Sequence, residues 1–258
     1  MGKLKGLQFI FLVLFFCPLM AQKKNTVNLG YGLNSGLLKD HNFSLLHYRE
    51  LGSIYALKYA RHNPKNKNVY ETEINFSSGK VKNSISELLT SNFIYAKIGT
   101  SYLREIKISK NEKWKYLVGA GYKTNLFYFQ WDDNEAFSFV ASHGFTLNFK
   151  TQFQINERNN INSTLEIPFM QILARPPYNG RDEFIIENEN SPAKIFFHGK
   201  LVTFNKYYGF CLNTNYNFNI TKCLDFALNY NLNYQKVTGI NKLIHLQNQL
   251  NIGLNFNF

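Results

Sequence analysis

Hydrophobic and polar residues alternate along most of the chain, and the pattern is clearest in the last segment, residues 245–258. Its apolar side chains lie at even positions, and its amides and Gly253 lie at odd positions, with Asn248 the one polar residue in the apolar row. Successive side chains of a strand point to opposite faces. The segment therefore predicts a β-strand with one apolar face and one amide-rich face.

The same two-residue period recurs in nine earlier segments and predicts an all-β protein. Clusters of turn-forming residues, such as 62–66 and 156–160, separate several of these segments. The ten predicted strands cover residues 27–34, 43–61, 69–77, 92–108, 114–131, 137–155, 161–169, 200–218, 224–235 and 245–258.

The last strand also carries the most specific motif, because the sequence stops on an aromatic residue. Leu254, Phe256 and Phe258 lie on its apolar face. This ending resembles the closing strand of bacterial outer-membrane β-barrels, whose assembly machinery reads a terminal aromatic residue. The resemblance implies that these three residues form a C-terminal assembly signal. It also implies that the barrel assembly machinery, outer-membrane lipid and lipopolysaccharide are partners.

The connections between the predicted strands fit a closed antiparallel transmembrane β-barrel of about ten strands. An even strand count brings both termini to one side, and outer-membrane barrels keep short turns in the periplasm and long loops outside. One set of connections is short, whereas the alternate set includes 78–91 and 175–199. Both termini are therefore expected in the periplasm. A barrel of twelve strands is the alternative, because Gly52 can split the second strand and 175–199 can contain a hairpin.

The first 21 residues predict a secretory signal peptide, so the barrel domain is expected to span residues 22–258. Lys3 and Lys5 precede a short apolar run, and Leu19-Met20-Ala21 fits a cleavage site after Ala21. Loss of the two lysines lowers the net charge from +12 to +10. An exported protein does not normally meet nucleic acid, so anionic lipid head groups are the expected counter-charge.

The polar face of each strand is expected to line the inside of the barrel, since an unpaired polar group in hydrocarbon costs several kcal/mol. Small barrels fill their interior with their own side chains. The charged residues on this face are therefore expected to form a paired lumen network rather than a selectivity filter. They are Lys58, Glu71, Glu73, Lys97, Lys115, Lys123, Lys150, Glu166 and Asp225.

Candidate catalytic residues do not emerge from the sequence. None of the six histidines has a serine two residues later, as in lipase-type barrels, and no Asp-x-His motif of the omptin proteases occurs. No Cys or His pair has zinc spacing, so neither a metal nor a cofactor is expected. The segment 175–199 has the most functional character, as long loops are often binding or plugging elements. Its candidate contact residues are Arg175, Tyr178, Arg181, Asp182 and Glu183.

Three functions follow as hypotheses. The first is a non-enzymatic outer-membrane barrel with a structural, surface-binding or narrow solute-path role. The second is an outer-membrane hydrolase, of lipase or protease type, with a site at the barrel rim. The third is a soluble exported β-sandwich that binds a ligand. The sequence leaves the oligomeric state open.

Overall fold

The computed structural model describes residues 25–258 apart from 43, 64, 66, 84–89, 107–112, 132–136, 178–181 and 240–241. The expected signal peptide therefore lies outside the described residues. The elements are β1 (Asn25–Asp40), β2 (Tyr48–Asn63), β3 (Asn68–Asn83), β4 (Thr90–Ile106), β5 (Trp114–Trp131), β6 (Phe137–Gln154), β7 (Asn159–Ala174), α2 (Glu183–Glu187), α3 (Pro192–Phe197), β8 (Lys200–Thr203), β9 (Tyr207–Asn219), β10 (Leu224–Val237) and β11 (Leu243–Asn257).

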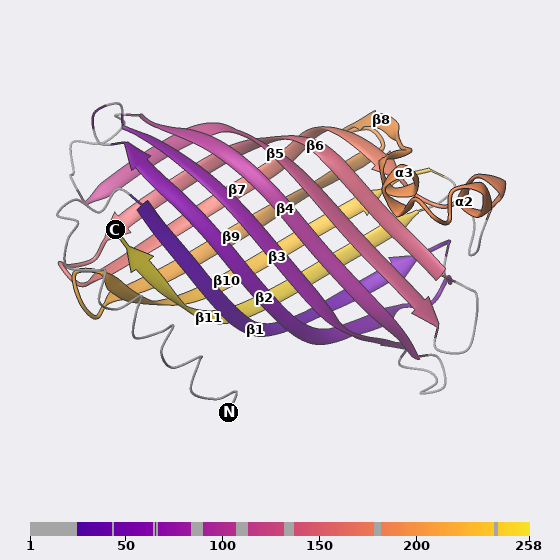
Figure 1. Cartoon of the computed structure of the whole chain (residues 1–258), viewed down its shortest axis with the longest axis horizontal. Coiled ribbons are helices and arrows are strands. Elements are labelled where there is room, and N and C mark those ends of the chain that lie inside the picture. Colours follow the sequence, from indigo (N-terminus) through magenta and orange to yellow (C-terminus); the bar gives the residue numbers. More distant parts are fainter. Residues whose placement is uncertain are drawn as a thin grey trace.

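The strands form a closed antiparallel barrel (Figure 1). Each strand pairs with its neighbours in the order β1 to β7 and then β9, β10 and β11, and β11 pairs with β1 to close the ring. The seam runs from Thr26↔Asn257 to Asp40↔Leu243. The prediction of about ten strands in a closed barrel is confirmed, and the soluble β-sandwich hypothesis is wrong.

The outer and inner faces differ as the alternation predicts. On β11, Leu250, Ile252 and Leu254 are 51%, 56% and 40% exposed on the outer face, whereas Gln247 and Gln249 are buried on the inner face. Large exposed apolar patches are rare on proteins that face water. The outer surface of the barrel is therefore suited to lipid hydrocarbon.

The predicted strand 200–218 is wrong as a single element, because it divides into β8 and β9 at residues 204–206. β7 pairs with β9 as far as Glu166↔Cys211 and then with β8 from Met170↔Thr203. Between these two ladders lies Pro168, which has no backbone N–H to donate. The register shift in the β6–β7 ladder, between Phe145 and Thr146, lies directly opposite this proline. The proline thus explains the break.

Several predicted connections are shorter than the sequence indicated. β3 continues to Asn83 and β4 begins at Thr90, so residues 78–83 belong to a strand rather than to a loop. The segment 175–199 contains no hairpin among its described residues and instead forms α2 and α3.

The two short helices lie at the rim, next to β6 and β8 in Figure 1, and cover part of the outer face. Ile185 of α2 packs with Phe137, Phe139 and Ala141 of β6, and the rings of Phe139 and Phe196 meet edge-to-face at 5.3 Å. These β6 residues point outward as predicted, but they are buried beneath the helices. No helix within the described residues is long and apolar enough to cross a bilayer.

We predict that Phe139→Ala will loosen the α2–α3 segment without unfolding the barrel. Burial of a phenylalanine side chain contributes about 1.5–3 kcal/mol, and protease cleavage follows local opening. Cleavage by trypsin after the exposed Lys194 should therefore accelerate by about tenfold. The matched control is Phe149→Ala, which removes an outward ring of β6 that is 45% exposed. Equal cleavage rates in the two variants would contradict the prediction.

Candidate functional site

The interior of the barrel is divided into layers along its axis. We call the end that carries the start of β1 and the end of β11 the terminus end, and the opposite end the loop end (Figure 1). From the terminus end inward lie a polar cavity, a group of paired lysines and glutamates, and a layer of apolar side chains. These layers are named below the vestibule, the lysine–glutamate cluster and the apolar layer.

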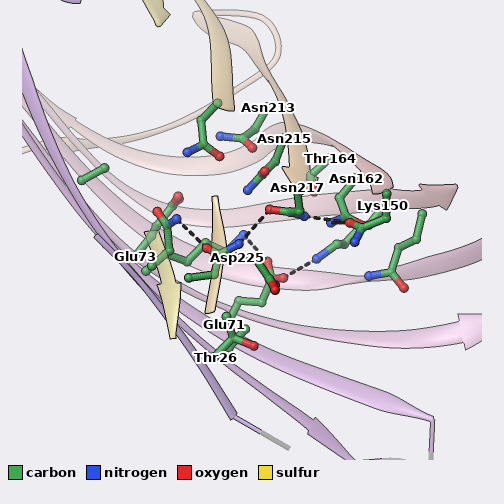
Figure 2. A pocket seen from close by; sticks show the side chains of 18 of the residues that line it. Thr26, Glu71, Glu73, Lys150, Asn162, Thr164, Asn213, Asn215, Asn217 and Asp225 are labelled. Carbon is green, nitrogen blue, oxygen red and sulfur yellow. Dashed lines mark hydrogen bonds and ion pairs between the residues drawn. The ribbon is translucent and has the colours of Figure 1, made fainter. Parts of the chain in front are cut away.

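The vestibule is a cavity of about 510 Å³ at the terminus end. Figure 2 shows polar side chains from several strands converging on it. One wall is charged and includes Lys58, Glu71, Glu73, Lys115 and Lys150. The other wall consists of amides from β1, β7, β9, β10 and β11 together with Asp225 of β10; the amides are Asn28, Asn160, Asn162, Asn213, Asn215, Asn217, Asn219, Asn229, Asn231, Gln249, Asn251, Asn255 and Asn257.

The amide wall is a hydrogen-bonded ladder that crosses from strand to strand. Asn28 Nδ2 donates to Asn255 Oδ1 at 2.6 Å, and Asn255 Nδ2 donates to Asn217 Oδ1 at 2.8 Å. Asn217 Nδ2 then donates to Asn160 Oδ1 at 2.7 Å, and Asn162 Nδ2 donates to the same oxygen at 3.1 Å. Because an amide both donates and accepts, each member orients the next. The wall is therefore preorganised.

Some buried polar atoms of this wall remain without a hydrogen-bond partner. They are Asp225 Oδ1, Asn215 Oδ1 and Gln249 Nε2. Asp225 uses its other oxygen to accept from Asn257 Nδ2 at 2.9 Å. Buried polar groups are normally paired with protein or with water. These three atoms are enclosed by neighbouring side chains, so the groups that the wall presents to the cavity are its other amide oxygens and nitrogens.

The lysine–glutamate cluster begins at the charged wall of the vestibule, with Lys58, Glu71, Glu73 and Lys150, and continues inward to Lys97, Lys123 and Glu166. Glu71 contacts Lys58 at 2.9 Å and Lys150 at 2.5 Å. Lys97 lies 2.9 Å from Glu73 and 3.2 Å from Glu166, while Lys123 lies 2.5 Å from Glu73 and also pairs with Glu166.

Each glutamate of the cluster thus contacts two lysines, which is how a nearly dry interior tolerates charge. Seven of the nine charged residues expected in the lumen meet in this cluster. The other two, Lys115 and Asp225, line the vestibule, and no ion pair joins them to the cluster among the described residues.

A second buried polar group was not singled out from the sequence. Glu50 accepts from Gln247 Nε2 at 2.7 Å and from the Asn34 amide, and its Oε2 lies 2.7 Å from His245 Nε2. The signal was available, because Glu50 shares the parity of Lys58 on β2. A carboxylate that orients an imidazole occurs in hydrolases. Here, however, Glu50 and His245 are 2% and 1% exposed, and the Phe127 ring lies 4.3 Å from the imidazole.

The apolar layer closes the lumen toward the loop end, and sequence reasoning missed it. Its buried members are Leu38, Tyr48, Val81, Phe93, Tyr95, Phe127, Phe129, Val140, Val202, Tyr207, Val237 and Leu243. They come from every strand except β7, which supplies the partly buried Leu173. The expectation that the inward face is polar throughout is therefore wrong. The signal was the run 126–129, in which both faces of β5 are apolar.

Above the apolar layer, the start of the 175–199 segment is tied into the barrel. Arg175 Nη2 contacts Asp40 Oδ1 at 2.5 Å, and Ser138 Oγ donates to Asp40 Oδ2 at 3.1 Å. Arg175 is therefore a buried structural residue rather than a surface contact. Asp182 caps α2 by accepting from Ile185 N at 2.8 Å, and Glu183 lies in its first turn. Tyr178 and Arg181 lie outside the described residues.

No group of three or more His, Cys, Asp or Glu side chains is arranged to hold a metal ion in the part of the chain that the structure describes.

We predict that Glu71→Gln will strongly destabilise the barrel. The change leaves Lys150 without a carboxylate partner among the described residues. Removal of one member of a buried pair costs about 3–5 kcal/mol. The matched control is Glu105→Gln, which breaks the exposed Lys67–Glu105 pair of 3.5 Å and should cost at most about 1 kcal/mol. Denaturant unfolding in detergent micelles measures both, and equal losses would contradict the prediction.

Comparisons with known proteins support the architecture. No protein-family model matches the chain, and no curated protein matches its sequence. The outer membrane protease OmpT of Escherichia coli is similar in structure, with a TM-score of 0.57 and 8% identity over 92% of this chain and 98% of that chain. Neisserial surface protein A has a TM-score of 0.40 and 11% identity over 91% and 97% of the two chains.

The toluene transporter TodX of Pseudomonas putida has a TM-score of 0.33 and 7% identity over 92% of this chain and 90% of that chain. At such low identities the likeness concerns the fold alone. The likeness to OmpT agrees with the closed ring of antiparallel strands. The resemblance read from the last strand is thereby confirmed at the level of architecture: the chain is folded as an outer-membrane β-barrel.

Proposed function

We propose that this chain is an integral outer-membrane protein with a non-enzymatic binding or structural role, and that its barrel does not conduct ions. The observation that carries the proposal is the apolar layer across the lumen. A water-filled path would have to pass between side chains such as Phe93, Phe127 and Phe129, each at most 2% exposed. Apolar constrictions block ions because water leaves them.

The outer surface supports residence in a membrane. Leu33, Leu51 and Ile252 are 63%, 65% and 56% exposed on the outer face of three adjacent strands. Exposure of this surface to water would cost a free energy of about 25 cal/mol per Å² of apolar area. Lipid hydrocarbon removes that cost, and the closed ladder leaves no free sheet edge within the hydrocarbon.

The connections support an orientation with the terminus end in the periplasm. The turns at this end are short, as at residues 155–158 and 220–223. The loop end carries the segment 175–199 with α2 and α3. Because outer-membrane barrels keep their long loops outside, the vestibule opens toward the periplasm and the helices lie at the cell surface.

A hydrolase function has less support. The protease activity in the name of OmpT belongs to that protein. The Glu50–His245 pair is sealed beneath the apolar layer, so a substrate cannot reach it. His143 is buried against the Phe197 ring at 4.4 Å, and neither of its ring nitrogens has a hydrogen-bond partner. A general base needs a partner that orients it.

We predict that the purified protein will give no conductance steps in a planar lipid bilayer, whereas Phe93→Ala combined with Phe127→Ala will. The two rings stack at 5.7 Å in the apolar layer, and their removal opens space for water. The matched control is Tyr122→Ala combined with Phe145→Ala, which removes an outward-facing pair at 5.5 Å. Conductance by the unmodified protein or by the control would overturn the proposal, as would a silent Phe93/Phe127 variant.

A further inference from the structure

We propose that the vestibule is a binding site for a short acidic glycan, that is, a sugar chain with hydroxyl or acetamido groups and at least one carboxylate. This inference rests on the proposed sealed barrel, since a cavity closed at one end retains a ligand rather than passing it. Its volume of about 510 Å³ lies within the range of about 300–1,000 Å³ typical of small-molecule sites.

The amide wall determines the neutral part of the ligand. The amides that line the cavity offer both kinds of partner, because each amide oxygen accepts and each amide nitrogen donates. A hydroxyl group can satisfy either kind, since it donates once and accepts twice. Closely spaced donors and acceptors on a preorganised wall therefore fit a polyhydroxylated molecule better than an apolar one or a simple ion.

The opposite wall determines the charge of the ligand. Glu71 and Glu73 are each already bound by two lysines. Lys115 lines the vestibule, is exposed and has no ion-pair partner among the described residues. The lining carries one more lysine than carboxylate, since Lys58, Lys113, Lys115 and Lys150 face Glu71, Glu73 and Asp225, and this excess of positive charge favours an anion. A carboxylate beside Lys115 makes a charge-assisted hydrogen bond while its sugar contacts the amides.

The location of the vestibule narrows the source of such a glycan. The cavity opens at the terminus end, where Asn219, Gln154 and Asn257 line it, and the apolar layer closes it toward the loop end. In the proposed orientation a periplasmic glycan reaches the site directly. The acidic sugars of lipopolysaccharide lie on the other side of the closure. We therefore assign the site to a cell-wall type of glycan.

The test is calorimetric titration of the full mature barrel in detergent micelles with three soluble probes. The first is a muramyl oligosaccharide, which carries carboxylates, the second is neutral chitotriose, and the third is an acidic core oligosaccharide of lipopolysaccharide. We expect saturable binding of the muramyl probe, at least about fivefold weaker binding of chitotriose, and no preference for the lipopolysaccharide core. Equal or tighter binding of the core would assign the site to the other source and overturn the cell-wall assignment.

Variants distinguish specific binding in the vestibule from non-specific electrostatic attraction of an acidic probe to a basic protein. Lys115→Gln should lower the affinity for the muramyl probe by about tenfold and leave the affinity for chitotriose unchanged, because it removes only the charge-assisted contact. Asn215→Ala should weaken both probes. The matched control is Lys67→Gln, which removes a lysine in the turn before β3, outside the vestibule lining, and should change neither.

Two outcomes would overturn the glycan proposal: no saturable binding of any probe, or equal effects of Lys115→Gln and Lys67→Gln. Heat-modifiable gel mobility verifies that each variant remains folded. Conductance tests the sealed lumen separately. If the protein neither conducts nor binds a glycan, the glycan proposal is refuted and the sealed barrel stands. If the protein conducts, the proposed closure of the lumen is refuted.

Discussion

The structure depends on one constraint: in hydrocarbon every backbone N–H and C=O group must find its partner within the protein. The seam between β1 and β11 meets it, because the ladder runs unbroken from Thr26↔Asn257 to Asp40↔Leu243. Even the ends are joined, since Asn25 and Phe258 exchange two backbone hydrogen bonds of 2.9 and 3.0 Å. A closed ring has no free edge, and closure in turn separates an outer face from an inner one.

Because of that separation, the position of a residue in the two-residue alternation decides whether its side chain faces outward or into the lumen. Outward positions meet lipid and accept any apolar residue, whereas inward positions meet only one another in a narrow lumen. The inner face therefore has two stable solutions, which the chain uses at different depths. Near the terminus end it pairs amides and charges, as in the contacts of Glu71, and farther in it packs rings such as Phe93 and Phe127.

Periodicity predicted what depends on local order and missed what depends on contacts across the barrel. The faces of β11 follow from Leu250, Ile252 and Leu254 alone, because alternation is a local property. The apolar layer was missed because Phe127 points inward but lies between two apolar neighbours. Where both faces of a strand are apolar, the alternation does not show which residues point into the barrel. The pairing of Glu73 with Lys97 follows from adjacent strands, but its sharing of Lys123 with Glu166 requires the closed ring.

The break opposite Pro168 illustrates how the same constraint is met where the regular ladder fails. Proline offers no donor, and the β6–β7 register shifts between Phe145 and Thr146. The backbone ladder resumes where β8 pairs with β7 from Met170↔Thr203 onward, and a side chain satisfies one carbonyl at the break, since Gln171 Nε2 donates to Phe145 O at 2.9 Å. A small cavity of about 30 Å³ remains beside Glu166 and Cys211. The wall is thus irregular where it adjoins the lysine–glutamate cluster, and the Gln171 side chain joins β7 to β6 there.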